Sequence, residues 1–143
     1  MTRATLRPAT DADLPRLLEV HEGAFRPLVE TRYAWDPAEQ RRILAESLAR
    51  AQVVLLDGRI VGQLIVTPVE GALFLERILL APEVQGRGLG TALIETVIAD
   101  ARAQGLPVTL SVWDTNRARA LYARLGFRVT HQEGFRVKMR LDP

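Results

Sequence analysis

The chain has 143 residues, which suits one domain with a single core, and 48% of them are hydrophobic, which excludes a disordered chain. The formal net charge is only +2, and the scattered basic residues are arginines except for Lys138, so nucleic-acid binding is not expected. Cysteine is absent, which excludes disulfides, thiolate metal sites and a cysteine nucleophile, and no apolar run is long enough for a membrane span or a signal peptide.

The first part of the chain predicts a strand and two helices. Residues 4–7 are the strand candidate, and Thr10 and Asp11 can cap the helix that follows. The predicted inner face of this helix consists of Leu14, Leu17, Leu18 and His21. Residues 26–35 show no clean period. A second helix is predicted from Asp36 as cap and Pro37 as first helical residue. Its predicted inner face consists of Ile43, Leu44, Ser47 and Leu48.

The middle of the chain predicts three successive antiparallel strands. Asp57-Gly58 is a strong two-residue turn signal inside the apolar segment 52–66. A second turn at residues 69–71 leads into a strand over residues 72–80, which Pro82 ends. The glycine-rich sequence VQGRGLGTAL, residues 84–93, comes directly after this third strand.

The remainder predicts two helices and three strands. The helical pattern from Gly88 to about Ala103 is followed by Gly105, which is typical of a helix end. A strand over 108–113 precedes a short helix with Ala118, Leu121, Tyr122 and Leu125 on one side and Gly126 as its stop. A hairpin, 127–131 with 135–141, closes the order β-α-α-β-β-β-α-β-α-β-β, which we expect to form one domain over residues 1–143.

The glycine-rich sequence predicts an anion site. Gly86, Gly88 and Gly90 leave the backbone bare where a helix begins, and the N–H groups of a helix N-terminus attract phosphate. Arg87 adds a positive charge. The Walker A lysine is missing, and Thr91 stands where a dinucleotide fingerprint needs its third glycine. The interpretation is therefore a phosphate or pyrophosphate held by backbone, with a simple change of chain direction as the alternative.

Two motifs together carry a resemblance to a known family. Gln85, Gly88 and Gly90 form Q-x-x-G-x-G, and about thirty residues later comes N-x-A-x-x-L-Y, residues 116–122, followed by L-G-F at 125–127. This pair of motifs resembles the GNAT family of N-acetyltransferases. The resemblance implies an α/β (α+β) fold with a central mixed, mostly antiparallel sheet of about seven strands and about four flanking helices. The sheet of that fold is splayed between the strands that correspond to 72–80 and 108–113.

The resemblance also implies that acetyl-CoA is the cosubstrate and that no metal takes part. In the family the glycine loop and its helix bind the pyrophosphate, and the main chain of the preceding strand contacts the pantetheine arm. Asn116 resembles an asparagine that bonds this arm, although it can also cap the helix that starts there. The implied cofactor-binding residues are Ile78, Leu79, Leu80, Gln85, Gly86, Arg87, Gly88, Leu89, Gly90, Thr91 and Asn116.

Two residues are implied in catalysis, in which an amine attacks the thioester directly in a ternary complex. Tyr122 matches the tyrosine that donates a proton to the departing thiolate, and core packing is its alternative role. Glu76 interrupts an apolar strand and is the first candidate for the base that deprotonates the amine. A salt bridge or solvent exposure would also explain it. A main-chain N–H near Leu79 or Leu80 is the candidate oxyanion donor.

In relatives the acceptor amine is recognised mainly by the first two helices and their connection, here residues 21–36. The candidate acceptor-binding residues are Glu30, Tyr33, Trp35 and Trp113, because carboxylates and aromatic rings suit a cationic amine. Packing under a loop is the alternative for the aromatic residues. The expected acceptor is a small-molecule or peptide amine. A peptide or protein N-acetyltransferase and a non-catalytic acyl-CoA-binding or sensing module are the alternative functions. A cytoplasmic location, no membrane partner and a homodimer are compatible with the sequence.

Overall fold

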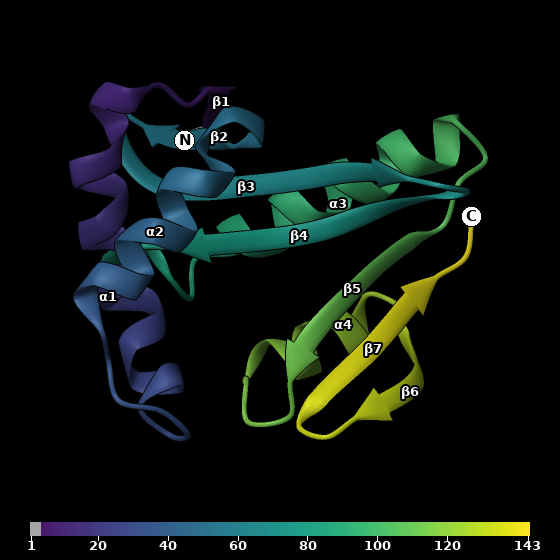
Figure 1. Cartoon of the computed structure of the whole chain (residues 1–143). Coiled ribbons are helices and arrows are strands. Elements are labelled where there is room, and N and C mark those ends of the chain that lie inside the picture. The colour runs from purple at the N-terminus through teal and green to yellow at the C-terminus, as the bar shows by residue number, and fades with distance from the viewer. Residues whose placement is uncertain (1–3) are drawn as a thin grey trace. The chain divides into compact units, whose positions relative to one another are not determined.

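The computed structural model describes residues 4–143, and its elements follow the predicted order (Figure 1). The helices are α1 (Leu14–Val29), α2 (Pro37–Ser47), α3 (Leu89–Ala103) and α4 (Ala118–Arg124). The strands are β1 (Thr5–Pro8), β2 (Gln52–Leu56), β3 (Arg59–Val69), β4 (Ala72–Leu80), β5 (Val108–Trp113), β6 (Arg128–Glu133) and β7 (Arg136–Leu141). Short 3-10 turns occupy Asp11–Asp13, Leu48–Arg50 and Pro82–Val84.

The strands form a seven-stranded mixed sheet in the order β1-β2-β3-β4-β5-β7-β6, as the resemblance implied. The pairs β1–β2, β2–β3, β5–β7 and β6–β7 are antiparallel, whereas β4 and β5 are parallel. The register of the parallel pair covers only Leu73–Leu75 with Val108–Leu110. Pairing over so few residues is expected when two parallel strands diverge.

Local turn chemistry explains how the hairpins form. Asp57 and Gly58 both have positive φ angles, 52° and 76°, which is the conformation that the two-residue turn between β2 and β3 requires. Gly71, with φ of 73°, follows the end of β3 and precedes β4. Both predicted turns are confirmed.

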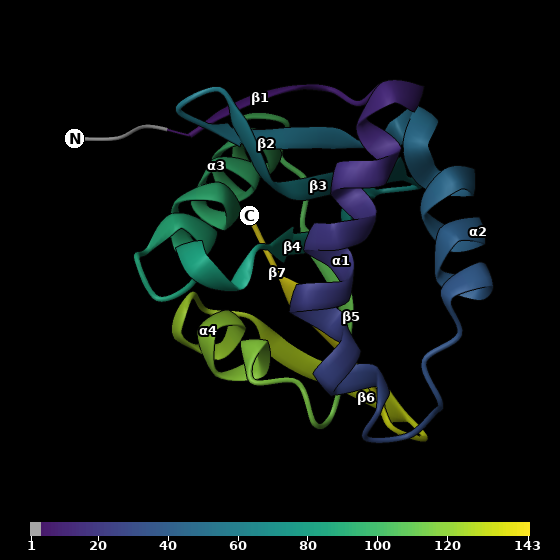
Figure 2. The same ribbon diagram turned by 90° about the vertical axis from the view of Figure 1, so that its left-hand side faces the viewer.

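The chain divides into two compact units. The first unit comprises the described residues up to Ile65 together with Arg77–Gly90, and the second comprises Val66–Glu76 and Thr91–Pro143. In the first unit α1 and α2 run side by side (Figure 2). Leu17 of α1 and Leu44 of α2 are fully buried in a cluster with Leu48 and Val53, so the apolar faces of both helices supply the core of this unit.

The end of α1 differs from the prediction. Residues 26–35 show no clean period in the sequence, but α1 continues to Val29 with Pro27 inside its last turn. Arg26 forms ion pairs with Glu22, at 3.5 Å, and with Glu30, at 3.4 Å, each four residues away on the same helix. Such pairs stabilise a helix end that the apolar pattern does not reveal.

The start of α1 is also delayed. Thr10 caps the 3-10 turn Asp11–Asp13, and α1 itself begins only at Leu14. Asp13 is buried and accepts hydrogen bonds from the Thr10 backbone N–H and from both terminal nitrogens of Arg7 at 2.8 and 2.9 Å. A buried carboxylate needs such partners, so this cluster ties β1 to the first helix.

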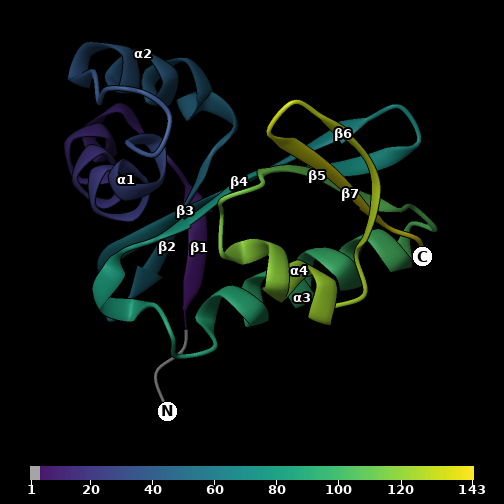
Figure 3. The ribbon, with the colours of Figure 1, turned by 90° about the horizontal axis from the view of Figure 1, so that it is seen from below.

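In the second unit α3 and α4 lie on one side of β5 and β7 (Figure 3). Val108, Leu110 and Val112 of β5 are buried while the residues between them are half-buried, which is the alternation of a sheet with one covered face. β6 is exposed along its whole length, and Lys138 is half-buried on β7. None of the helices within residues 4–143 is long and apolar enough to cross a membrane.

We predict that acid destabilises the protein partly through Asp13. The hydrogen bonds from Arg7 lower the pKa of Asp13 from 3.8 to about 2 in the folded state. The stabilisation is therefore fully present above pH 4 and is lost as the pH falls through about 2. Asp13→Asn should lower the free energy of unfolding at pH 7 by about 1–3 kcal/mol and flatten its acid dependence. Urea unfolding at several pH values measures both, with the exposed Asp11→Asn as control; equal acid dependence in both variants would contradict the prediction.

Candidate functional site

The glycine loop before α3 belongs to the first unit and is open. Gly86 and Gly88 have φ angles of 77° and 79°, and a Cβ built on either one meets no atom within 4 Å. Both residues are exposed, as is Arg87 between them. The backbone N–H groups of the first turn of α3 have no carbonyl one turn earlier in the helix as a partner. They can therefore donate hydrogen bonds to a ligand. The loop thus combines bare backbone, the positive end of a helix and one cation.

The side chain of Gln85 holds this loop to the end of β4. Its Nε2 donates a hydrogen bond of 2.9 Å to the carbonyl oxygen of Leu80. The glutamine of the predicted motif therefore makes a structural bond in this chain. Gln85 connects the loop to Ile78–Leu80, the strand segment predicted to lie along the cofactor arm.

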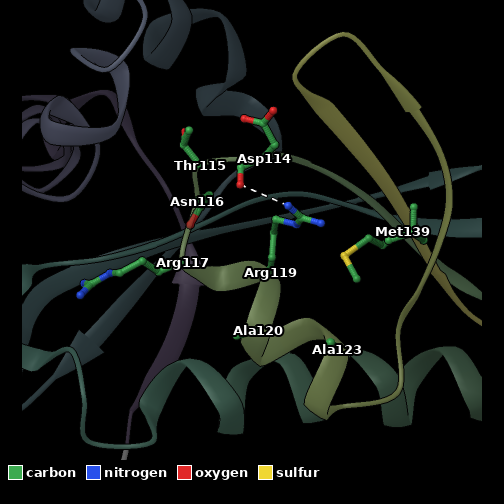
Figure 4. A pocket seen from close by; sticks show the side chains of 9 residues that line it. Asp114, Thr115, Asn116, Arg117, Arg119, Ala120, Ala123 and Met139 are labelled. Atoms are coloured by element: carbon green, nitrogen blue, oxygen red, sulfur yellow. Dashed lines mark hydrogen bonds between the residues drawn. The ribbon is translucent and has the colours of Figure 1, made fainter.

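Asn116 lies at the start of α4 in the second unit, beside a groove of about 510 Å³ (Figure 4). The groove is lined by Asp114, Thr115, Asn116, Arg117, Arg119, Ala120, Ala123, Val129 and Met139. The Oδ1 atom of Asn116 accepts a hydrogen bond of 2.9 Å from the backbone N–H of Ala118. Asn116 therefore has the capping role that the sequence offered as an alternative, and its Nδ2 group is the end left to donate to a ligand.

The same segment is braced by Arg119. Its Nη1 donates to the backbone carbonyl of Asp114 at 3.2 Å, which is the dashed line in Figure 4. Because this bond spans the turn between β5 and α4, it fixes the position of Asn116.

Tyr122 lies on α4 and is only 6% exposed. Its ring meets Phe127 in an edge-on contact with centroids 5.8 Å apart, so it packs in the core of the second unit. Burial raises the pKa of Tyr122 to about 12, because the phenolate would lose its hydration. The phenol thus stays protonated at neutral pH, as a proton donor must.

Glu76 and Trp113 are half-buried residues of the second unit. A carboxylate oxygen of Glu76 accepts a hydrogen bond of 3.1 Å from the hydroxyl of Thr67 on β3. Trp113 packs edge-on against Phe135, with ring centroids 5.0 Å apart. Thr67 lies on β3 and Phe135 in the turn between β6 and β7, so each of the two residues is held in place by one such neighbour.

The predicted acceptor residues of the first unit differ in their surroundings. Glu30 is exposed and paired with Arg26, and Tyr33 is 56% exposed. Trp35 is half-buried: its ring centroid lies 5.6 Å from that of His21, and the Arg26 guanidinium lies 5.9 Å from its centroid. Trp35 therefore belongs to an aromatic cluster, in agreement with its packing alternative.

Two polar groups of the first unit were not predicted as site residues. His21 bonds Gln40 of α2, and Arg77 of β4 donates to Ser47 at 2.9 Å and to Gln63 at 3.3 Å. His21, Ser47 and Gln63 are all buried. The only signal in the sequence was a histidine at a core position of a helix, and nothing local pointed to its partners.

The predicted residues are distributed over both units. Residues 78–80 and 85–90, Glu30, Tyr33 and Trp35 belong to the first unit, whereas Glu76, Thr91, Trp113, Asn116 and Tyr122 belong to the second. Within residues 4–143, no group of three or more His, Cys, Asp or Glu side chains is arranged to hold a metal ion.

Both the sequence and the fold resemble those of known proteins. The sequence model described as the acetyltransferase (GNAT) family matches residues 14–127. An L-methionine sulfoximine/L-methionine sulfone acetyltransferase from Pseudomonas paraeruginosa is 31% identical over 150 aligned positions, covering 90% of this chain and 83% of that protein.

Two solved structures share the fold. The PaiA N-acetyltransferase of Thermoplasma acidophilum in complex with coenzyme A has a TM-score of 0.81 at 18% identity, covering 99% of each chain. A ribosomal-protein alanine N-acetyltransferase from Escherichia coli has a TM-score of 0.74 at 22% identity, covering 98% of this chain and 94% of that one.

We predict that Tyr122 ionises only at strongly alkaline pH. The chain has two tyrosines, so Tyr33→Phe leaves Tyr122 as the single phenol. Its ultraviolet phenolate absorbance should rise with a midpoint near pH 12, provided that circular dichroism shows the fold intact. A midpoint near 10, the ordinary value for tyrosine, would contradict the burial that the structure assigns to this side chain.

Proposed function

Because the chain belongs to the GNAT family of acetyltransferases, we propose that it transfers the acetyl group of acetyl-CoA to a primary amine. The observation that carries the proposal is the open glycine loop at the start of α3. Its residues Gly86 and Gly88 expose backbone amides to which no Cβ bars access, which fits a pyrophosphate. Arg87 would add charge, and Gln85 would hold the loop through Leu80.

The first unit is proposed to hold the rest of the cofactor along β4. Acetyl-CoA, when bound, supplies an acetyl thioester that an amine can attack. The main chain of Ile78–Leu80 would bind the pantetheine arm, and an N–H near Leu79 or Leu80 would stabilise the developing oxyanion. The remaining Nδ2 donor of Asn116 and the amide of Thr91 are the proposed contributions of the second unit.

Tyr122 is the proposed proton donor. A departing thiolate needs a proton, and the buried phenol still carries its own at neutral pH. Glu76, held by Thr67, is the candidate from the sequence for the base that deprotonates the acceptor. With the help of these two side chains, the amine would attack the thioester directly, without a covalent enzyme intermediate.

The first acceptors to test are small α-amino acids. The relative that is 31% identical is named for L-methionine sulfoximine and L-methionine sulfone, both of which carry an α-amine. Peptides and polyamines complete the panel. Release of free thiol from acetyl-CoA in the presence of one of these amines would support the proposal, and coenzyme A binding without turnover on any of them would favour the sensing module.

We predict that Gly88→Asp abolishes coenzyme A binding. The substitution strains a residue with positive φ and places a carboxylate beside the pyrophosphate, so affinity should fall by at least ~30-fold, or ~2 kcal/mol. Gly105→Asp is the matched control, since Gly105 at the other end of α3 has φ of 68° and equally open surroundings. Isothermal titration with coenzyme A measures both. Retained affinity in Gly88→Asp would contradict the site.

We predict that Tyr122→Phe slows turnover by about 100-fold, the contribution typical of a general acid. The ring and its contact with Phe127 remain, so coenzyme A affinity and stability should change little. Steady-state kinetics with the best amine gives kcat, and thermal unfolding reports on the fold. An unchanged kcat would remove Tyr122 from the chemistry and leave it a packing residue.

A further inference from the structure

His21 occupies an unusual position on the inner face of α1. Its side chain is only 6% exposed, and its Nε2 lies 2.7 Å from the Oε1 atom of Gln40 on α2. An amide oxygen only accepts hydrogen bonds, so Nε2 carries the proton. In the neutral ring the lone pair then lies on Nδ1. Gln40 thus selects one tautomer and fixes the orientation of the ring.

The other ring nitrogen lacks a partner. Nδ1 of His21 is buried and makes no hydrogen bond with any residue in the described part of the chain. Buried polar atoms are nearly always hydrogen-bonded, because an unmade bond costs free energy, so each exception needs an explanation. Two aromatic rings flank the imidazole of His21: its centroid lies 5.4 Å from that of Phe25 and 5.6 Å from that of Trp35.

The elements that hold His21 are themselves firmly placed. Asp36 caps α2 by accepting a hydrogen bond of 3.1 Å from the Ala38 backbone N–H, directly after Trp35. The backbone N–H of Gln40 bonds the carbonyl of Asp36 at 3.0 Å. One capped helix start therefore positions both the aromatic neighbour and the hydrogen-bond partner of His21.

The charges around His21 favour its neutral form. Burial lowers the pKa of His21 below its usual 6.5, and the cationic Arg77 of β4 lowers it further, against the opposing bond from Gln40. From α1 itself, Arg26 lies over the ring of Trp35, and α2 presents the uncharged Gln40. A neutral imidazole with an oriented partner and a vacant lone pair has the features of a general base.

We propose that His21 is the general base of the acetyl transfer, accepting at Nδ1 a proton from the acceptor's ammonium group directly or through one bound water. This inference rests on the proposed function. One N–H bond of the ammonium breaks and an Nδ1–H bond forms, which leaves the amine's electron pair for attack on the thioester. The imidazolium later returns its proton to water. Gln40 is a positioning residue, and His21 takes the role of base for which Glu76 was the candidate from the sequence.

The chain allows a direct test, because it contains only two histidines and the other, His131, is exposed on β6. His131→Gln therefore leaves His21 as the single histidine signal in a nuclear magnetic resonance titration. We expect the Nε2–H tautomer and a pKa below 6.5. The acid limb of the pH profile of kcat/KM should follow the same pKa.

Gln40→Glu, made in the same background, places a carboxylate at Nε2 and should raise the pKa of His21. We expect the acid limb of kcat/KM to move to higher pH by the same amount. If His21 had a purely structural role, a change in its pKa would not move the acid limb of kcat/KM. A moved histidine pKa with an unmoved limb, or loss of the limb in Glu76→Gln, would overturn the proposal.

His21→Asn gives the second readout. At neutral pH kcat should fall by about 100-fold while coenzyme A affinity stays within about twofold. The deficit should shrink as the pH approaches the pKa of the amine, because a neutral amine needs no base. A deficit that is constant with pH would overturn the proposal. Failure of the wild-type chain to acetylate any amine would instead reject the proposed function, and the base role with it.

Discussion

The close approach of two strands at Gly62 constrains the first unit. A Cβ on Gly62 would lie 2.4 Å from the carbonyl oxygen of Leu79 and 2.8 Å from a methyl carbon of Leu80, so only glycine allows β3 to pass there. Next to it, the backbone N–H of Ala81 donates to Val61 at 2.7 Å. The end of β4 is thereby fixed, and this is the segment whose main chain is proposed to face the cofactor.

The glycine loop inherits its position from this constraint. Gln85 reaches back from the loop to the carbonyl of Leu80, so the bare amides of Gly86 and Gly88 are tied to a strand that cannot shift. Precise placement matters for a site that binds through backbone, because no flexible side chain can adjust to the ligand. A rigid sheet and a tethered turn together hold the backbone amides in more precise positions than a longer loop would.

Local signals explain how much could be predicted. The turn at Asp57-Gly58 and the cap at Asp36 each depend on residues adjacent in the sequence, and both were predicted correctly. The family motifs named the cofactor-binding residues one by one, and that assignment stays a prediction. The bond of Gln85 was missed, because a glutamine in a loop has many partners within reach.

The polar interior of the first unit could not be predicted. Residues 21, 40, 47, 63 and 77 come from four elements, and their contacts arise only when α1, α2 and the strands have packed. His21 was placed on a core face by its helical spacing, but neither its bond to Gln40 nor its unbonded nitrogen has a signature in the sequence. The same holds for the last turn of α1, which continues beyond Arg26 although it contains Pro27.

The positive charges of this protein have a chemical consequence. Thioesters of coenzyme A acetylate neutral amines, whereas the guanidinium of arginine stays protonated and inert. Lys138, half-buried on β7, is the only side-chain amine in the sequence, and pairs such as Arg7–Asp13 depend on arginine alone. Such a surface is nearly immune to spontaneous acetylation. It keeps its charge and its ion pairs in the presence of the very reagent that the protein is proposed to use.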